Sequence, residues 1–162
     1  MTIRPMQASD LDRVLKIAES LAHAPRWTLP MYETAIRQRN VPPRVALVAE
    51  ETRSGQVVGF AVASVILPEA ELETIGVATD QQRQGIGRQL IEEACRILRG
   101  MEVRKVILEV RASNWAAQRL YQSSGFVPTG RRASYYIDPE EDGLIMKRDT
   151  REGRLPRVNQ GP

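Results

Sequence analysis

The sequence has few of the residues that mark several common classes of protein. Its 162 residues include one cysteine, Cys95, and one histidine, His23. A single cysteine cannot form an internal disulfide, which excludes a disulfide-stapled scaffold and favours a reducing compartment. No apolar run is long enough to span a bilayer, and the first residues lack the apolar stretch of a signal peptide. We therefore expect a cytoplasmic protein without a membrane partner.

A strong charge of one sign is also lacking. The chain has 23 basic and 20 acidic side chains, which gives a net charge of +3. This balance does not indicate nucleic-acid binding, so we expect no direct contact with nucleic acid. The length fits one domain with a substantial core, which we place at residues 1–148. We expect residues 149–162 to form a polar, basic and solvated C-terminal tail.

A glycine-containing loop is the most informative motif. It reads Gln82-Arg83-Gln84-Gly85-Ile86-Gly87-Arg88. It follows a strand-like run at residues 72–77 and precedes an amphipathic helix predicted to begin near Gln89. A loop that enters a helix N-terminus presents unpaired N–H groups at the positive end of the helix dipole, which favours a pyrophosphate. Gly85 and Gly87 allow a close approach of the backbone because they lack a Cβ. The two arginines add positive charge.

The periodicity of the apolar residues predicts alternating strands and helices. The predicted strands cover residues 2–6, 45–50, 56–66, 72–77, 106–111, 126–136 and 143–147. The predicted helices cover a segment opening at residues 9–12, then residues 29–38, a segment from near 89 that has Gly100 just past its end, and residues 114–123. This order predicts a single α/β domain.

Three motifs taken together resemble the GNAT superfamily of acetyl-CoA-dependent N-acetyltransferases. The pattern Q-x-x-G-x-G after a strand and before a helix resembles its coenzyme A pyrophosphate loop. Residues 108–114 and 120–126 resemble the closing half of the same fold. Residues 131–136, followed by Asp142 and Met146, resemble the bacterial ribosomal-protein alanine N-terminal acetyltransferase subgroup.

The resemblance implies an α/β fold with an open, mixed, mostly antiparallel sheet, flanked by helices and splayed between its fourth and fifth strands. The strands at residues 72–77 and 106–111 would diverge, and the main chain of Ile75 and Val77 would bind the pantetheine arm of acetyl-CoA. Asn114 matches a position that hydrogen-bonds the pantetheine. The implied pyrophosphate contacts are Gln82, Arg83, Gln84, Gly85, Gly87 and Arg88. No metal is required.

The resemblance also implies a general base and a general acid. Glu109 matches the base of the subgroup, and Tyr121 matches the tyrosine that protonates the coenzyme A sulfur. An α-amino group has an ordinary pKa of about 8, so a modest base suffices, and a phenol keeps its proton at neutral pH. Glu71 and Glu73 on the preceding strand are rivals for the base, because histone-type members place it at the position of Glu71. Alternatively, they are solvated surface carboxylates, or they orient the substrate amine.

Tyr135 and Tyr136 resemble the element that folds over the peptide backbone in protein N-terminal acetyltransferases. We therefore expect the acceptor to be the N-terminal α-amine of a protein, and specifically of a ribosomal protein. Two alternatives stay open. Burial of both tyrosines away from the cleft would favour an enzyme that acetylates a small amine or antibiotic. Glu109 and Tyr121 side chains that point away from the sulfur would favour a non-catalytic acetyl-CoA-binding domain. The oligomeric state is open as well.

Overall fold

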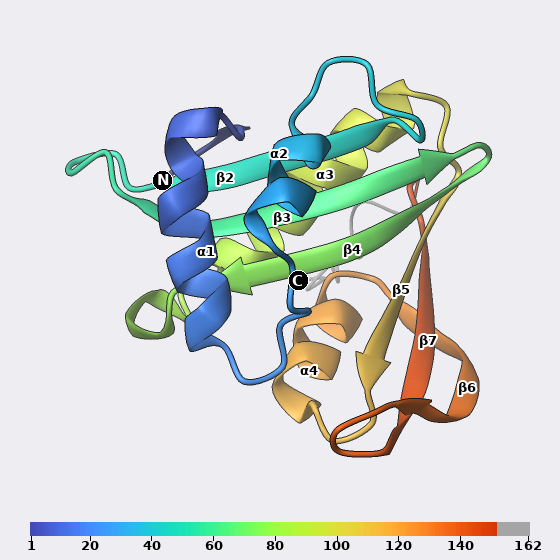
Figure 1. The fold of residues 1–162 in the computed structure, drawn as a ribbon. Helices are drawn as coiled ribbons and strands as arrows, with labels where there is room; N and C mark the ends of the chain where they lie inside the picture. The colour runs from blue at the N-terminus through green and yellow to red at the C-terminus, as the bar shows by residue number, and fades with distance from the viewer. Residues whose placement is uncertain (152–162) are drawn as a thin grey trace, which may run out of the picture.

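One seven-stranded mixed sheet with helices on both faces forms the protein (Figure 1). The computed structural model describes residues 1–151. The strand order is β1-β2-β3-β4-β5-β7-β6, and every neighbouring pair is antiparallel except β4 with β5. The strands are β1 (Thr2–Pro5), β2 (Arg44–Glu50), β3 (Val57–Ile66), β4 (Glu69–Val77), β5 (Lys105–Arg111), β6 (Val127–Tyr136) and β7 (Glu141–Asp149). The helices are α1 (Leu11–Ser20), α2 (Leu29–Ala35), α3 (Ile86–Gly100) and α4 (Trp115–Ser123), with 3₁₀ turns η1 (Ala8–Asp10) and η2 (Thr79–Gln81). The predicted fold class is confirmed.

The sheet opens between β4 and β5, as predicted. The two strands pair only from Glu69 with Lys105 to Glu71 with Ile107. Beyond that point β4 continues beside β3, whereas β5 continues beside β7. Figure 1 shows β5, β6 and β7 running steeply away from the direction of β2, β3 and β4. The second half of β4 therefore has one edge without a neighbouring strand.

Two hydrophobic cores cover the two faces of the sheet. On one face α3 buries a stripe against β2, β3 and β4, and its buried apolar residues are Ile86, Leu90, Ile91, Ala94, Cys95 and Leu98. On the other face α1 and α2 pack against β3 through Val14, Ile17, Tyr32, Phe60 and Val62. Each helix has its apolar residues three and four positions apart, so one side of it meets the sheet. No helix of the described residues is long and apolar enough to cross a membrane.

A β-bulge in β4 changes which side chains face each core. The register passes from Val62 opposite Thr74 to Ala63 opposite Leu72, so Glu73 is an extra residue in β4. Before the bulge Leu72 packs on the α3 side, and after it Ile75 packs on that same side. Simple alternation from Leu72 would have placed Thr74 there instead. The bulge thus reorients the strand where it begins to line the opening.

Three helix boundaries differ from the prediction. Helix α3 begins at Ile86 and not near Gln89, because Gly85 makes the turn and the next two residues already lie in the helix. Gly100 is the last helical residue, and the left-handed position after the helix is Glu102, with φ 68°. Helix α2 ends early at Ala35, whose carbonyl accepts a hydrogen bond from the Asn40 side chain. The Glu102 amide and the Asn40 side chain thus donate to helix-end carbonyls that have no partner inside the helix.

The folded region extends beyond the expected boundary at residue 148. Strand β7 runs through Asp149, which pairs with Lys105. Thr150 is buried, and its hydroxyl donates to the Val103 carbonyl. The remainder of the predicted basic tail, residues 152–162, lies outside the described residues.

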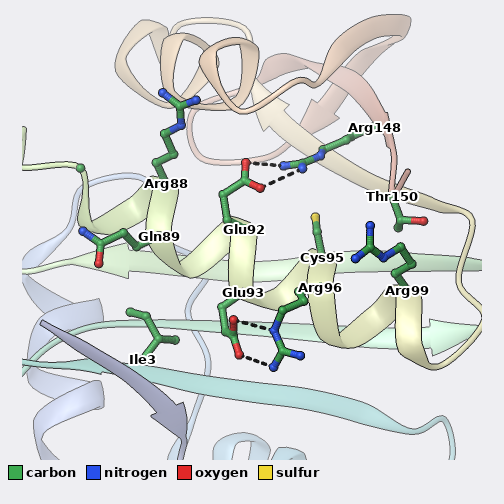
Figure 2. A pocket seen from close by; sticks show the side chains of 11 residues that line it. Ile3, Arg88, Gln89, Glu92, Glu93, Cys95, Arg96, Arg99, Arg148 and Thr150 are labelled. Carbon is green, nitrogen blue, oxygen red and sulfur yellow. Dashed lines mark hydrogen bonds and ion pairs between the residues drawn. The ribbon is translucent and has the colours of Figure 1, made fainter. Parts of the chain in front are cut away.

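Arg148 connects three elements of the second half of the fold. Its side chain is 2% exposed and donates two hydrogen bonds to Glu92 of α3, at 2.9 and 3.1 Å. It also donates to the Ser124 carbonyl at the end of α4, at 2.7 Å. Figure 2 shows Glu92 and Arg148 turned toward one another, with Glu93 and Arg96 turned toward one another on the other side of α3. The buried arginine therefore fixes β7 against both helices.

We predict that Arg148→Met lowers the free energy of unfolding by about 1–3 kcal/mol, because the Ser124 carbonyl loses its charged donor inside the protein. Glu92 is 41% exposed and can turn to water, which limits the loss. Arg96→Met is the matched control, since its ion pair with Glu93 is at the surface and we expect a change within about 0.5 kcal/mol. Urea unfolding measures both. Equal effects of the two substitutions would contradict this role of Arg148.

Candidate functional site

The loop before α3 has the backbone of an anion-binding site. Arg83 has φ 62° and Gly85 has φ 81°, so two left-handed residues turn the chain just before the helix. Side chains at positions 82–85 and at Arg88 are exposed. Gly85 is the N-cap residue of a 15-residue helix and no side chain caps it. Successive N–H groups in such a turn, at the positive end of a long helix, form a cradle for phosphate.

The two glycines of this loop have different environments. A Cβ added to Gly85 would meet nothing within 4 Å, so only the left-handed backbone demands glycine there. A Cβ on Gly87 would lie 2.9 Å from a methyl carbon of Leu120 in α4. Gly87 is buried inside the first turn of α3. Gly85 therefore shapes the exposed cradle, and Gly87 lets α3 pack closely against α4.

The open edge of β4 presents main-chain groups to the gap between the strands. The Ala78 amide donates to the Val58 carbonyl, so alternate residues of β4 back from Ala78 bond to β3. Ile75 and Val77 consequently direct their N–H and C=O groups to the opposite side, where β5 has diverged. The Gln82 side chain already donates to the Val77 carbonyl at 3.1 Å. This geometry fits the predicted role of Ile75 and ties the phosphate loop to the same strand.

The predicted pantetheine ligand Asn114 also caps a helix. Its side-chain oxygen accepts a hydrogen bond from the Ala117 amide at 3.2 Å, as the N-cap residue of α4. Gln118, one turn later, donates to the carbonyls of Arg111 and Ala112. These bonds hold α4 against the end of β5. A cofactor contact from Asn114 would therefore come from its amide nitrogen.

Tyr121, the predicted general acid, is buried between α4 and the start of β6. It lies on the buried side of α4, is 8% exposed and packs edge-on against Phe126 with ring centroids 5.8 Å apart. Burial, together with the neighbouring Tyr136, raises the pKa of Tyr121 well above its usual value. The phenol therefore keeps its proton at neutral pH until a stronger base forms beside it.

Glu109 lies on the face of β5 that is opposite its buried residues Val106, Leu108 and Val110. Its side chain is 18% exposed. One carboxylate oxygen, Oε1, lies 3.4 Å from the Arg132 guanidinium. The other, Oε2, is buried and has no hydrogen-bond partner within residues 1–151. A buried carboxylate oxygen without a donor can accept a proton or a hydrogen bond from a bound amine.

The two rival carboxylates on β4 have different partners. Arg44 of β2 donates to both oxygens of Glu73, at 2.9 and 3.3 Å. Glu71 forms no ion pair within residues 1–151, and partial burial followed by the charges of Glu73 and Glu109 raises its pKa. The charge of Glu73 is therefore paired with Arg44 within the fold. Glu71 lies near Glu109, and a cation bound beside it would stabilise its ionised form.

Tyr135 and Tyr136 lie beside Glu109 and not away from it. Their rings are 5.1 Å apart and nearly perpendicular. Burial, followed by the charge of Glu109, raises the pKa of Tyr136 to about 12. The charge of Glu109, followed by burial, also raises the pKa of Tyr135, whose side chain is 46% exposed. The Arg111 guanidinium covers the Tyr136 ring, 4.4 Å from its centroid.

Three arginines of this region were not among the predicted site residues. Arg44 forms an ion pair with Glu73, and Arg132 forms one with Glu109. The Arg111 guanidinium stacks on the Tyr136 ring. Only Arg132 could have been suspected from the sequence. Consecutive residues of a strand point to opposite faces, so one of the pair Arg131-Arg132 must lie on the same face as the site. The partner of Arg44 lies 29 residues away in the sequence and has no local signal.

A groove of about 640 Å³ runs along the outward side of α3 (Figure 2). It begins at Gly85 and Arg88 of the phosphate loop and continues past Glu92 to Arg99 and Thr150. The residues of the β4–β5 opening do not line it. Cys95 borders this groove, and burial raises the pKa of its thiol to about 11. A protonated, buried thiol is a packing group and not a nucleophile, as predicted.

The sequence model of the acetyltransferase (GNAT) family matches residues 12–126, which include the phosphate loop, β4, β5 and Tyr121. The chain belongs to the GNAT family. This acetyltransferase is 38% identical over 147 residues to the ribosomal protein bS18-alanine N-acetyltransferase of Escherichia coli K12, and the match covers 90% of this chain and 95% of that protein. The predicted enzyme class, an acetyl-CoA-dependent N-acetyltransferase, is confirmed.

Solved structures of related proteins agree with the fold. The crystal structure of the ribosomal-protein-S18-alanine N-acetyltransferase from Escherichia coli superposes with a TM-score of 0.76 at 32% identity, over 97% of both chains. A Bacillus anthracis protein, solved in complex with acetyl coenzyme A, shares the fold with a TM-score of 0.75 at 22% identity, over 91% of this acetyltransferase and 97% of that chain. The opening between β4 and β5 thus belongs to an acetyltransferase fold.

We predict that Gly85→Ala weakens binding of coenzyme A to this acetyltransferase about 5- to 30-fold, because a left-handed backbone costs a residue with a Cβ about 1–2 kcal/mol. Gly100→Ala is the matched control, since a Cβ there meets nothing within 4 Å and no left-handed backbone is required. Titration calorimetry measures both affinities, and circular dichroism checks the folds. A folded Gly85→Ala protein with unchanged affinity would show that this turn does not contact the cofactor.

Proposed function

We propose that this acetyltransferase transfers the acetyl group of acetyl-CoA to the N-terminal α-amine of a protein, and that this protein is a ribosomal protein. The gathering of Glu109, Tyr135 and Tyr136 beside the β4–β5 opening carries the proposal. It supports an acceptor site at one end of the opening, with Tyr121 adjacent to Tyr136. The proposed phosphate cradle at Gly85 is the N-terminus of α3, and this helix packs against β4.

The residues present fit acetyl-CoA as the acyl donor. The left-handed turn before α3 suits the pyrophosphate, and the free edge of β4 at Ile75 suits an extended amide-containing arm. Bound acetyl-CoA supplies a thioester whose carbonyl carbon is open to attack by an amine. All other steps fall to side chains of the protein.

Glu109 is the general base of the proposed reaction. Its buried Oε2 accepts the proton that the α-ammonium must lose before nitrogen can attack the carbonyl carbon. Glu71, which forms no ion pair within the described residues, attracts and orients the ammonium group. Glu73 is not a base in this scheme, because Arg44 engages both of its oxygens.

Tyr121 is the general acid of the proposed reaction. Its phenol is protonated at neutral pH and can give this proton to the sulfur that leaves when the C–S bond breaks. Its position on α4 is fixed by the Asn114 cap and by packing on Phe126. The base and the acid thus come from different elements, β5 and α4, that meet near Tyr136.

The acceptor is proposed from the tyrosine pair and from the relatives. Tyr135 and Tyr136 stand next to the base, which does not match the buried arrangement that would favour a small-amine enzyme. Their hydroxyls can bond the first peptide groups of an extended N-terminus. The Escherichia coli relative is named for bS18 alanine acetylation, and a ribosomal protein here would place the reaction in the cytoplasm.

We predict that Tyr121→Phe and Glu109→Gln each lower kcat by about 100- to 10,000-fold, because each removes one proton transfer. Raising the pH should restore part of the Glu109→Gln activity, since more of the amine is then neutral. Glu71→Gln should instead raise the KM for peptide with a smaller effect on kcat. Steady-state assays with an N-terminal peptide measure these values. A silent Glu109→Gln beside an inactive Glu71→Gln would assign the base to β4.

We predict that a short peptide with a free N-terminal alanine is acetylated on its α-amine. Its Nα-blocked twin that carries an internal lysine should not react, because the tyrosine pair closes the site to side-chain amines. Replacing both tyrosines by alanine should raise the KM for peptide far more than the KM for acetyl-CoA. Mass spectrometry locates the acetyl group. Preferred acetylation of the blocked lysine peptide, or of a small polyamine, would overturn the N-terminal assignment and leave acetyl transfer intact.

A further inference from the structure

Two consecutive arginines of β6 face opposite sides of the sheet. Arg131 turns outward and pairs with Asp142 of β7, at 2.6 Å. Arg132 turns inward, where its guanidinium lies 3.4 Å from Glu109 Oε1 and 5.1 Å from the centroid of the Tyr135 ring. A charge contact and an aromatic contact together hold the guanidinium in one place, although its side chain is 54% exposed.

Glu109 lies among charges that do not cancel without Arg132. Across the opening, β4 contributes Glu71, whose pKa is raised partly by Glu109 and lowered by Arg132. Strand β6 contributes Arg132 and the two phenols, and β7 places the uncharged Ile145 opposite Glu109. Arg111, on the same strand as Glu109, is directed to the Tyr136 ring and to Glu141. Arg132 is therefore the cation that contacts Glu109 within the described residues.

The contact also distinguishes the two oxygens of the carboxylate. Arg132 approaches Oε1, whereas Oε2 is buried without a hydrogen-bond partner in the described part of the chain. A carboxylate that is held at one oxygen has a fixed orientation, so the other oxygen points in one direction. A base must be within hydrogen-bond reach of the proton it removes, so this orientation decides whether it can act.

We propose that Arg132 is a positioning residue of the acetyl-transfer reaction: it holds Oε1 of Glu109, leaves Oε2 for the proton of the acceptor amine, and offsets the negative charge of Glu71. The proposal rests on the assignment of Glu109 as the base in the proposed function. Arg132 acts through Glu109 and does not itself transfer a proton.

The first test compares Arg132→Met with Arg131→Met in the full-length enzyme, using acetyl-CoA and an N-terminal alanine peptide. Without Arg132 the Glu109 carboxylate loses the contact that orients it towards the acceptor amine. We therefore expect Arg132→Met to lower kcat about 10-fold, with a much smaller effect on the KM for acetyl-CoA. Arg131→Met should leave kcat unchanged, and Arg132→Lys should restore part of it. An Arg132→Met enzyme with the kcat of the wild type would overturn the proposal.

The second test separates this proposal from the base assignment. In a Glu109→Gln background the carboxylate is gone, so Arg132→Met should have no further effect on kcat. An equal loss in both backgrounds would show that Arg132 acts elsewhere and would overturn the proposal. A silent Glu109→Gln would instead refute the assignment of the base. Arg132→Gln, which keeps a hydrogen-bond donor without the charge, gives the same comparison if the methionine variant does not fold.

Discussion

The short parallel contact between β4 and β5 is the constraint on which the rest of the site depends. Three residue pairs hold the two strands together, and beyond Glu71 and Ile107 they separate. Backbone groups at a sheet edge must find partners in water, in side chains or in a ligand. The separation therefore supplies unpaired main chain at Ile75 and lets Glu109 face open space from the strand across the gap. The open edge of β4 is therefore available for binding a ligand.

Helices α3 and α4, which lie on the two sides of this opening, are packed against one another and joined by hydrogen bonds through Arg148. Gly87, at the start of α3, lies against Leu120 in α4, the residue before Tyr121. At the other end, Arg148 bonds to Glu92 of α3 and to the Ser124 carbonyl after α4. Helix α3 carries the phosphate cradle and α4 carries the proposed acid. Close packing at one end and a buried charge at the other thus fix α3 against α4, and with them the distance from the Gly85 turn to Tyr121.

Much of the architecture was predictable from the sequence, and the reasons for the exceptions are physical. The glycine loop and the alternation of Val106, Leu108 and Val110 are local signals, and they placed α3 and β5 correctly to within a few residues. The opening of the sheet came from the family resemblance and not from periodicity. The bulge at Glu73 was not predictable, because the alternation from Glu71 through Thr74 reads equally well as a regular strand.

The arrangement of charges within the site was the least predictable part. Arginines of distant strands pair with some of the three carboxylates, Glu71, Glu73 and Glu109. These ion pairs determine which carboxylate oxygens can still bind a substrate. Arg44 reaches Glu73 from β2, and Arg132 reaches Glu109 from β6. Sequence spacing cannot rank such long-range pairs, because it carries no information on which strands become neighbours. The sequence named all three carboxylates as candidates, and their separate partners became visible only in the structure.

Strand β6 is exposed at every residue except Tyr136, yet it supplies Arg132, Tyr135 and Tyr136 to the acceptor side. Substitutions on such a strand remove little buried apolar surface, so they change stability little. The residues proposed to bind the acetyl donor, by contrast, lie on a loop and a strand that adjoin the main core. Acceptor preference can therefore diverge among descendants of this fold by changes in one peripheral strand, while the machinery for the shared donor is retained.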